Sequence, residues 1–227
     1  MRSTKVAVAI ALAGILVAWA LYASSGATFA WPWQWGAARG DPALVRPVAA
    51  TDHIFGNPAA PAMLIVYCDF TSPYCQSFST TMHELIANDG AGGQVAWVAR
   101  AFPLSLTAGA ALAEERAAAC AARASGNDAY WRFADLLYAN QPADPAQFGA
   151  LAEEAGVAGS GFAQCYANAS GQVDAAIKAD RQNALDIGAD GTPYSLLLVK
   201  GRAPVVIDGA YSYDALRAAV DQALGNG

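Results

Sequence analysis

Positive charge is scarce in this sequence of 227 residues, and the charged residues together make up only 14% of it. The net charge is −6 over the whole chain, and from Thr51 onward nine Lys and Arg face eighteen Asp and Glu, which gives 9 − 18 = −9. No run of basic residues is present. Because binding to nucleic acid depends on cations that neutralise phosphates, we expect no nucleic-acid partner.

Histidine is also scarce, and the two that occur, His53 and His83, have no partner at a spacing typical of metal ligands. Cys75 and His83 are eight positions apart, too far for a compact pair of ligands on one helix. The sequence therefore predicts neither a metal site nor a bound cofactor.

Charge is absent from Val6 to Ala23, an apolar run of 18 residues that follows Arg2 and Lys5. This pattern predicts a membrane anchor or a signal peptide in residues 1–23, and its length favours the anchor. The tryptophans between 31 and 35 match the aromatic belt of a membrane interface. We expect the N-terminus in the cytoplasm and the rest of the chain in the cell envelope outside it. Secretion after cleavage remains the alternative.

The remainder of the chain predicts one α/β domain, at 51–227, after a linker rich in Gly, Pro and Ser at 24–50. A buried strand at 62–67, a helix at 75–88 and a strand at 94–102 imply a right-handed parallel crossover. An Ala-rich stretch at about 108–170 has helical periodicity and no good strand. A helix, two short strands around the turn at 200–202, and an amphipathic helix at 213–224 complete the pattern.

The segment from Asp69 to Cys75, with the sequence DFTSPYC, carries the most specific signal. It resembles the active site of DsbA-like thiol-disulfide oxidoreductases, where Cys-Pro-aromatic-Cys begins a helix after a strand. Other matching pieces follow in the family's order: 52–58, 100–104, 127–141 and Gly191-Thr192-Pro193. The resemblance implies a thioredoxin fold (βαβ followed by ββα) with an all-helical insertion. It covers roughly 51–225.

The resemblance implies exchange of disulfides with extracytoplasmic protein thiols, and a possible redox partner in the membrane. Its nucleophile position falls on Ser72, its second cysteine on Cys75, and its acidic residue on Asp69. Asp69 then either moves protons or is simply a charge at the start of the helix. Substrate would be bound by Pro73, Tyr74, Thr192 and Pro193. We expect Thr192–Pro193 to be cis and to lie beside Ser72.

The departure from the family pattern is Ser72, because a hydroxyl forms no disulfide and the thiolate is the nucleophile in exchange. Ser72 is nevertheless a good helix N-cap. The sequence therefore predicts an intact fold with impaired exchange. Two alternatives stay open: a redox-inactive peptide-binding module, and a glutathione-dependent enzyme in which Ser72 acts like the serine of kappa-class glutathione transferases.

Four cysteines outside the cytoplasm face an oxidising compartment, and they allow three complete pairings. Cys68 ends a strand, where a buried core cysteine is common, and a Cys68–Cys75 bridge is the alternative. The resemblance implies a structural disulfide between Cys120 and Cys165, against two buried free thiols. Such a bond encloses a long loop and would stabilise the domain by roughly 4 kcal/mol.

Overall fold

The computed structural model describes residues 40–90, 92–107 and 109–225. The predicted anchor at 1–23 and the linker up to residue 39 lie outside the described residues. The chain divides into two units, and the unit that holds all described residues runs from Arg39 to Gly227. Within the described part, none of the helices combines the length and the apolar character that a membrane span needs.

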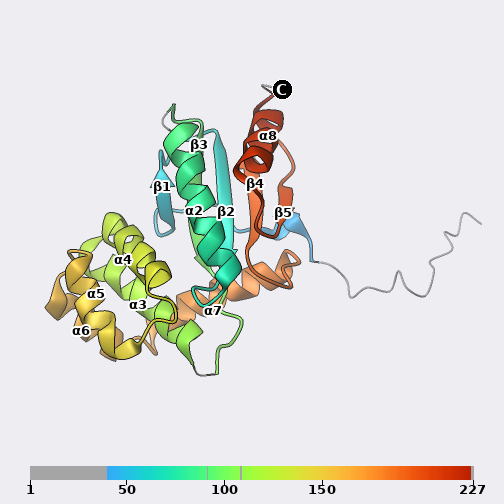
Figure 1. Cartoon of the computed structure of the whole chain (residues 1–227). Helices are drawn as coiled ribbons and strands as arrows, with labels where there is room; N and C mark the ends of the chain where they lie inside the picture. Colours follow the sequence, from blue (N-terminus) through green and yellow to red (C-terminus); the bar gives the residue numbers. More distant parts are fainter. Residues whose placement is uncertain (1–39, 91, 108, 226–227) are drawn as a thin grey trace, which may run out of the picture. The chain divides into compact units, whose positions relative to one another are not determined.

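The centre of the domain is a five-stranded sheet in the order β1-β3-β2-β4-β5 (Figure 1). Its strands are β1 (His53–Gly56), β2 (Ala62–Cys68), β3 (Val95–Ala101), β4 (Tyr194–Val199) and β5 (Val205–Asp208). Strands β2 and β3 are parallel, and the other three pairs are antiparallel. The uninterrupted apolar run of β2, with Ile65, Val66 and Tyr67 as its best strand formers, suits a central strand that is covered on both faces.

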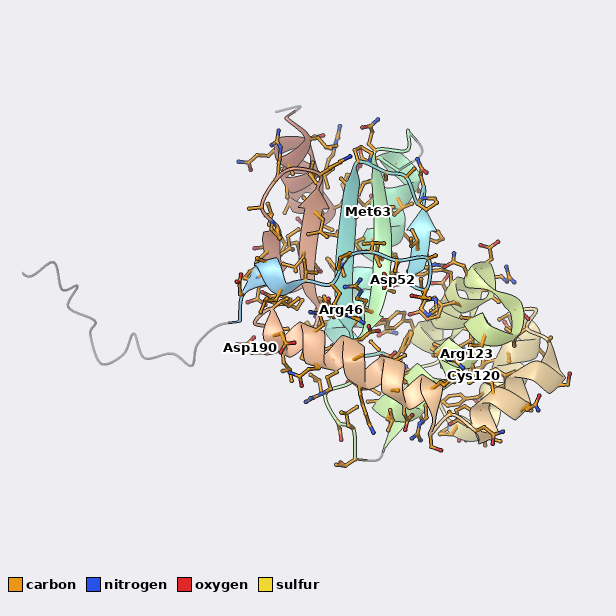
Figure 2. All side chains as sticks on the ribbon, turned by 180° about the vertical axis from the view of Figure 1, so that it is seen from behind. Arg46, Asp52, Met63, Cys120, Arg123 and Asp190 are labelled. Carbon is orange, nitrogen blue, oxygen red and sulfur yellow. A yellow bond between two sulfur atoms is a disulfide. The ribbon has the colours of Figure 1, made fainter. Side chains whose placement is uncertain are left out.

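Helices cover both faces of this sheet (Figures 1 and 2). One face carries α2 (Pro73–Asn88) and α8 (Tyr213–Leu224), and α7 (Gln172–Asp186) crosses the other. The core divides accordingly, because side chains along a strand alternate between faces. Leu64 and Val66 of β2 pack with α2 and α8, whereas Ile65 and Tyr67 pack with α7.

An all-helical insertion between β3 and α7 confirms the expected break in the α/β pattern. It contains α3 (Ala110–Ser125), α4 (Asn127–Ala139), α5 (Phe148–Glu154) and α6 (Gly159–Ala167). Phe133, Phe148 and Phe162 form its aromatic centre, with ring centroids 5.6–6.4 Å apart. The insertion extends the core that covers the α2 face of the sheet.

Residues 40–50, which the sequence assigned to the linker, contact α7 in the structure. The backbone N–H of Asp41 donates to the carbonyl of Asp186 at 2.9 Å, and Asn183 donates to the carbonyl of Leu44 at 2.9 Å. Arg46 pairs with Asp180 of the same helix. This part of the predicted linker therefore packs on the domain.

The element order that the sequence predicted is present, with one strand added. Strand β1 was not predicted, because four residues that are mostly half-buried carry too little periodicity to identify a strand. It pairs antiparallel with β3 at the edge of the sheet, from His53 opposite Ala99 to Gly56 opposite Ala96.

Candidate redox site at the start of helix α2

Cys75 lies in the first turn of α2, at the position of the family's second cysteine. Ser72 is the N-cap: its hydroxyl oxygen accepts a hydrogen bond from the Cys75 N–H at 3.4 Å, and Pro73 follows as the first helical residue. Cys75 itself is 1% exposed. The free N–H groups and the positive end of the helix dipole at this position favour a thiolate over a thiol.

Cys75 forms a disulfide with Cys68, and their Cα atoms are 5.9 Å apart. The expectation that Cys68 is an ordinary core cysteine is therefore wrong, and the alternative bridge is present. The register explains the pairing: Cys68 is the last residue of β2 and packs on the α2 side of the sheet, where Cys75 also lies. The turn between them brings both sulfur atoms to one place.

Asp69 shapes that turn. Its carboxylate accepts hydrogen bonds from the Thr71 N–H at 2.8 Å and the Thr71 hydroxyl at 2.7 Å. Its second oxygen accepts from the Leu104 N–H at 2.8 Å, which ties the turn to the segment after β3. Asp69 is 1% exposed, so these three bonds satisfy a buried carboxylate. This arrangement makes Asp69 an anchor of the turn between the two cysteines.

The Thr192–Pro193 peptide bond is cis, which confirms that prediction from the sequence. Tyr194 lies opposite Tyr67 in the last pair of the antiparallel β2–β4 pairing, and Cys68 and Pro193 are the residues next to that pair. The Pro193 carbonyl accepts a hydrogen bond from the Gly209 N–H at 3.0 Å. The cis-proline loop therefore adjoins the strand that ends in the disulfide. Proximity to Ser72 remains a prediction.

Three large apolar side chains are exposed on segments that adjoin this site. Tyr74 is 67% exposed beside Cys75, and Leu104 is 55% exposed on the segment bonded to Asp69. Tyr211 is 42% exposed, and its N–H donates to the carbonyl of Gly209, the residue that also bonds to Pro193. Pro73 is exposed as well, whereas Pro193 is buried. Large apolar side chains that are exposed near one another often mark a binding surface, whereas single scattered ones are common on any protein.

The second disulfide joins Cys120 of α3 to Cys165 of α6, with Cα atoms 5.5 Å apart. This is the pairing that the resemblance implied. It lies within the helical insertion (Figure 2 labels Cys120), and it encloses 45 positions of sequence against 7 for Cys68–Cys75. Since both pairs are bonded, no cysteine is free among the described residues.

Sequence reasoning missed two buried carboxyl groups on α3, Glu114 and Glu115, which are 0% and 4% exposed. Burial raises the pKa of Glu114 to about 7, against a hydrogen bond from Gln141 that lowers it. The pKa of Glu115 is raised well above its ordinary value, first by burial and then by the charge of Asp69. Their signal in the sequence is an adjacent acidic pair inside an Ala-rich helix, where one of the two would have to face the core.

Comparisons with known proteins agree on the domain. A thioredoxin family model matches residues 49–222. The Na(+)/H(+) antiporter NhaA 1 of Salinispora arenicola is 31% identical over 175 residues, which cover 76% of this chain and 25% of the antiporter. The chain thus spans about a quarter of the length of that curated relative.

Two solved structures show the same fold. The Wolbachia pipientis alpha-DsbA1 structure superposes with a TM-score of 0.68 at 19% identity, and covers 82% of this chain and 96% of its own. A thioredoxin-like oxidoreductase from Silicibacter pomeroyi gives a TM-score of 0.64 at 24% identity, with 78% and 94% covered. At these identities the likeness describes the fold.

Proposed function

This chain belongs to the thioredoxin family, and we propose that its domain exchanges disulfides with protein thiols outside the cytoplasm through Cys68 and Cys75. The observation that carries the proposal is the disulfide between the last residue of β2 and the first turn of α2. Cys75 has a cysteine partner after all, so Ser72 does not deprive it of a dithiol–disulfide cycle.

The two sulfur atoms differ in a way that assigns their roles. Cys68 is partly exposed and Cys75 is buried, so an incoming thiolate reaches Cys68 more readily. Exchange is faster when the leaving sulfur is the better-stabilised thiolate, and the helix N-terminus provides that stabilisation at Cys75. Exposure and leaving-group ability therefore both direct attack to Cys68.

The proposed cycle has two steps. A thiolate of the substrate attacks the Cys68 sulfur, a mixed disulfide forms, and Cys75 leaves as a thiolate. A second substrate thiolate then attacks the substrate sulfur of that mixed disulfide, and Cys68 leaves. The substrate loses two electrons and two protons and gains a disulfide, while Cys68 and Cys75 end as thiols. The reverse sequence reduces a substrate disulfide.

The surroundings favour a polypeptide substrate. Tyr74, Leu104 and Tyr211 are exposed on segments that adjoin the site, and we expect Pro73, Thr192 and Pro193 to border it. These groups would hold an extended segment with apolar residues next to its cysteine. They also favour a second candidate, a redox-inactive module that binds peptides on the same surface. The glutathione-dependent alternative receives no such support, because the Ser72 hydroxyl is buried and caps the helix.

We place the domain in the cell envelope, held by the N-terminal segment at 1–23 or secreted after its cleavage. Two disulfides in one small domain suit an oxidising compartment. Repeated turnover needs a second protein that reoxidises or reduces the pair, and an anchored domain would meet that partner in the membrane.

The decisive experiment compares the natural chain with Cys68→Ser, Cys75→Ser and Ser72→Cys. Each is assayed for insulin reduction and for oxidation of a reduced dithiol peptide. We expect the natural chain to be active and both serine variants to be inactive. Cys75→Ser should retain a stable mixed disulfide on Cys68, because the internal thiol that would release it is missing.

Other outcomes separate the candidates. Peptide binding by the natural chain without any mixed disulfide would favour the redox-inactive module. Exchange activity that appears only in Ser72→Cys would contradict a redox role for Cys68–Cys75. It would instead support the prediction from the sequence that Ser72 impairs exchange.

A further inference from the structure

Residues 40–52, which we call the strap, lead into β1 and pack on the domain. Gly40 begins the strap so close to the end of α7 that a Cβ atom on it would lie 2.1 Å from the carbonyl oxygen of Asp186 and 2.3 Å from the nitrogen of Gly188. The next residue, Asp41, donates its N–H to the same Asp186 carbonyl at 2.9 Å. Because only glycine allows two backbones to approach this closely, Gly40 fixes the point where the strap meets the domain.

Asn183 of α7 joins the strap to the central strand β2. Its side-chain nitrogen donates to the Leu44 carbonyl at 2.9 Å, and its side-chain oxygen accepts from the Arg46 N–H at 3.1 Å. The same oxygen accepts from the Tyr67 hydroxyl at 2.7 Å. Asn183 is 5% exposed, so these bonds satisfy a buried amide. One side chain therefore connects the strap, α7 and β2.

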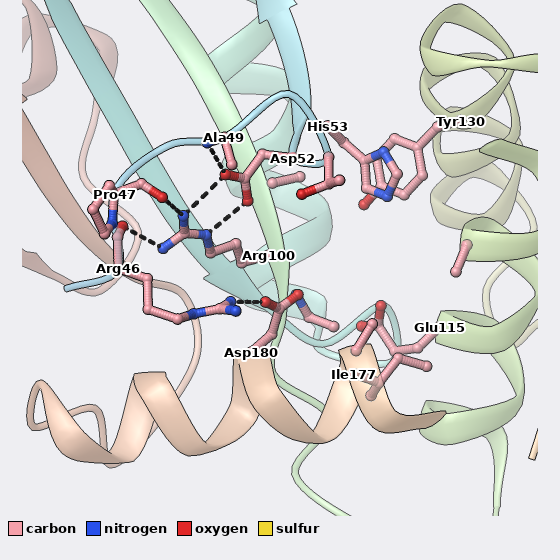
Figure 3. Close-up of a pocket in the computed structure, with 15 residues that line it drawn as sticks. Arg46, Pro47, Ala49, Asp52, His53, Arg100, Glu115, Tyr130, Ile177 and Asp180 are labelled. Atoms are coloured by element: carbon pink, nitrogen blue, oxygen red, sulfur yellow. Dashed lines mark hydrogen bonds and ion pairs between the residues drawn. The ribbon is translucent and has the colours of Figure 1, made fainter. Parts of the chain in front are cut away.

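Arg100 of β3 makes a second set of bonds to the strap (Figure 3). Its buried guanidinium donates to both oxygens of Asp52 at 2.9 and 3.0 Å, and to the carbonyls of Arg46 at 3.0 Å and Pro47 at 3.1 Å. A fifth bond goes to the Tyr67 hydroxyl at 3.0 Å. Arginine has five N–H donors, so all of them are used. Loss of the strap would leave this buried cation with one bond, which is unfavourable for a buried charge.

Arg100 and Asn183 meet at Tyr67, which is fully buried in β2. The Tyr67 hydroxyl accepts from Arg100 and donates to Asn183. Tyr67 directly precedes Cys68, the sulfur to which the proposed exchange directs the incoming thiolate. Neighbouring residues share a planar peptide unit, so a fixed Tyr67 limits the positions open to Cys68. The two groups that bind the strap thus also restrain the reactive end of β2.

The cis-proline loop has a matching support. Tyr194 directly follows Pro193 and lies opposite the same tyrosine of β2 in the sheet. The Tyr194 hydroxyl donates to the carbonyl of Ile187 at 3.1 Å. The next residue along the chain, Gly188, is the one that packs on Gly40 of the strap. The strap therefore contacts the supports of both strand ends at the redox site.

We propose that Arg100 and Asn183 are positioning residues of the redox site, and that they act by holding the strap against Tyr67. This role rests on the proposed exchange function. The docked strap keeps Cys68 and Pro193 in the relative positions that an extended substrate needs. Release of the strap leaves the disulfide in place but lets the two strand ends shift. A small thiol needs only access to the disulfide, whereas a peptide also needs the loop in its correct position.

The first test compares two rates in the full chain: opening of Cys68–Cys75 by a peptide with one cysteine, and opening by dithiothreitol. Asn183→Ala and Tyr67→Phe each remove a bond that links the strap to β2. Because a displacement of about 1 Å can slow a positioned reaction by about 10²-fold, we expect the peptide rate to fall at least ~10-fold. The dithiothreitol rate should stay the same or rise. Equal changes in the two rates, or no change in either, would overturn the proposal.

Tyr213→Phe is the matched control. It removes a phenol hydroxyl of the same kind, which donates to Asp89 at 2.9 Å at the C-terminal end of α2, away from the strap. This variant should leave the ratio of the two rates unchanged. Urea unfolding shows whether each variant is folded under the assay conditions. A change of the ratio in Tyr213→Phe as large as in Tyr67→Phe would assign the effect to stability and overturn the proposal.

A second readout does not depend on disulfide chemistry, and its variant leaves both positioning residues in place. Gly40→Val puts a side chain where the Asp186 carbonyl lies and should displace the start of the strap. We expect faster amide hydrogen exchange at 67–70 and 192–195, measured by mass spectrometry, and no change in α5 and α6. Unchanged protection at both strand ends would overturn the proposal. Faster hydrogen exchange there, in a chain that fails to exchange disulfides, would uphold the link between strap and strand ends and reject the exchange function.

Discussion

The two disulfides of this domain lie at opposite ends of helices. Cys68–Cys75 joins the end of β2 to the first turn of α2, whereas Cys120–Cys165 joins the middle of α3 to the last turn of α6. A thiolate is favoured at a helix N-terminus and disfavoured at a C-terminus. The electrostatics of the helix ends therefore favour opening of the first pair over opening of the second.

The loops they enclose differ as well. The separations are 7 and 45 residues, and the chain-entropy model gives about 2.4 and about 4 kcal/mol of stabilisation. The long loop makes the insertion bridge the stronger contribution to folding. The short loop limits what the domain loses each time Cys68–Cys75 opens. Under the proposed exchange function, in which Cys68–Cys75 opens in every cycle, most of the disulfide stabilisation thus lies in a bond outside the cycle.

The largest difference between the pairs should appear in exchange activity. Cys68→Ser and Cys75→Ser are expected to reduce activity to background, because each leaves one sulfur without its partner. The double variant Cys120→Ala/Cys165→Ala should keep the activity, measured by peptide oxidation at a temperature where all variants are folded. Loss of exchange activity in the double variant would contradict the assignment of exchange to Cys68–Cys75 alone.

The free energy of unfolding should depend more on Cys120–Cys165 than on Cys68–Cys75. We expect loss of about 4 kcal/mol of unfolding free energy for Cys120→Ala/Cys165→Ala, and about 2.4 kcal/mol for Cys68→Ala/Cys75→Ala. The measurement is urea unfolding of the oxidised proteins, with the midpoint and slope fitted together. Equal losses would show that loop length is not what separates the pairs.

Reduction of the folded protein should be selective. Helix-end electrostatics favour opening of Cys68–Cys75 by about 1–2 kcal/mol, which corresponds to a preference of about 5–30-fold. Titration in a glutathione redox buffer, followed by alkylation and peptide mapping, gives the two equilibria separately. Earlier reduction of Cys120–Cys165 would contradict the assignment.

The smallest expected effect concerns the helix caps. Ser72 and Ser212 cap α2 and α8 with the same geometry, each accepting from the N–H three residues on at 3.4 Å. Replacing either with Ala should cost about 1 kcal/mol of stability. Only Ser72→Ala should also change the alkylation rate of Cys75 in the reduced protein. An equal change in the alkylation rate of Cys75 in Ser212→Ala would show that the rate follows overall stability and not the cap of α2.

Much of the site was predictable because its signals are local. Pro73 after Ser72 identifies the helix start, and the resemblance of Gly191-Thr192-Pro193 to the family's loop implied the cis bond. The pairing of Cys68 could not be derived, since Cys68 and Ser72 both precede the helix and only the fold of the turn decides which residue faces Cys75. Asp69 determines that fold through hydrogen bonds to Thr71 and to Leu104, which is 35 positions away.

The sequence by itself determined the α/β order, the helical block and the start of α2 after Ser72, because hydrophobic periodicity and helix-start residues act over a few neighbours. Only the tertiary structure decided that Cys68 bonds to Cys75 and that Glu114 and Glu115 of α3 are buried. Those relations depend on strand register and on the packing of α3 against the turn, and contacts between distant segments leave no periodic trace in a single sequence.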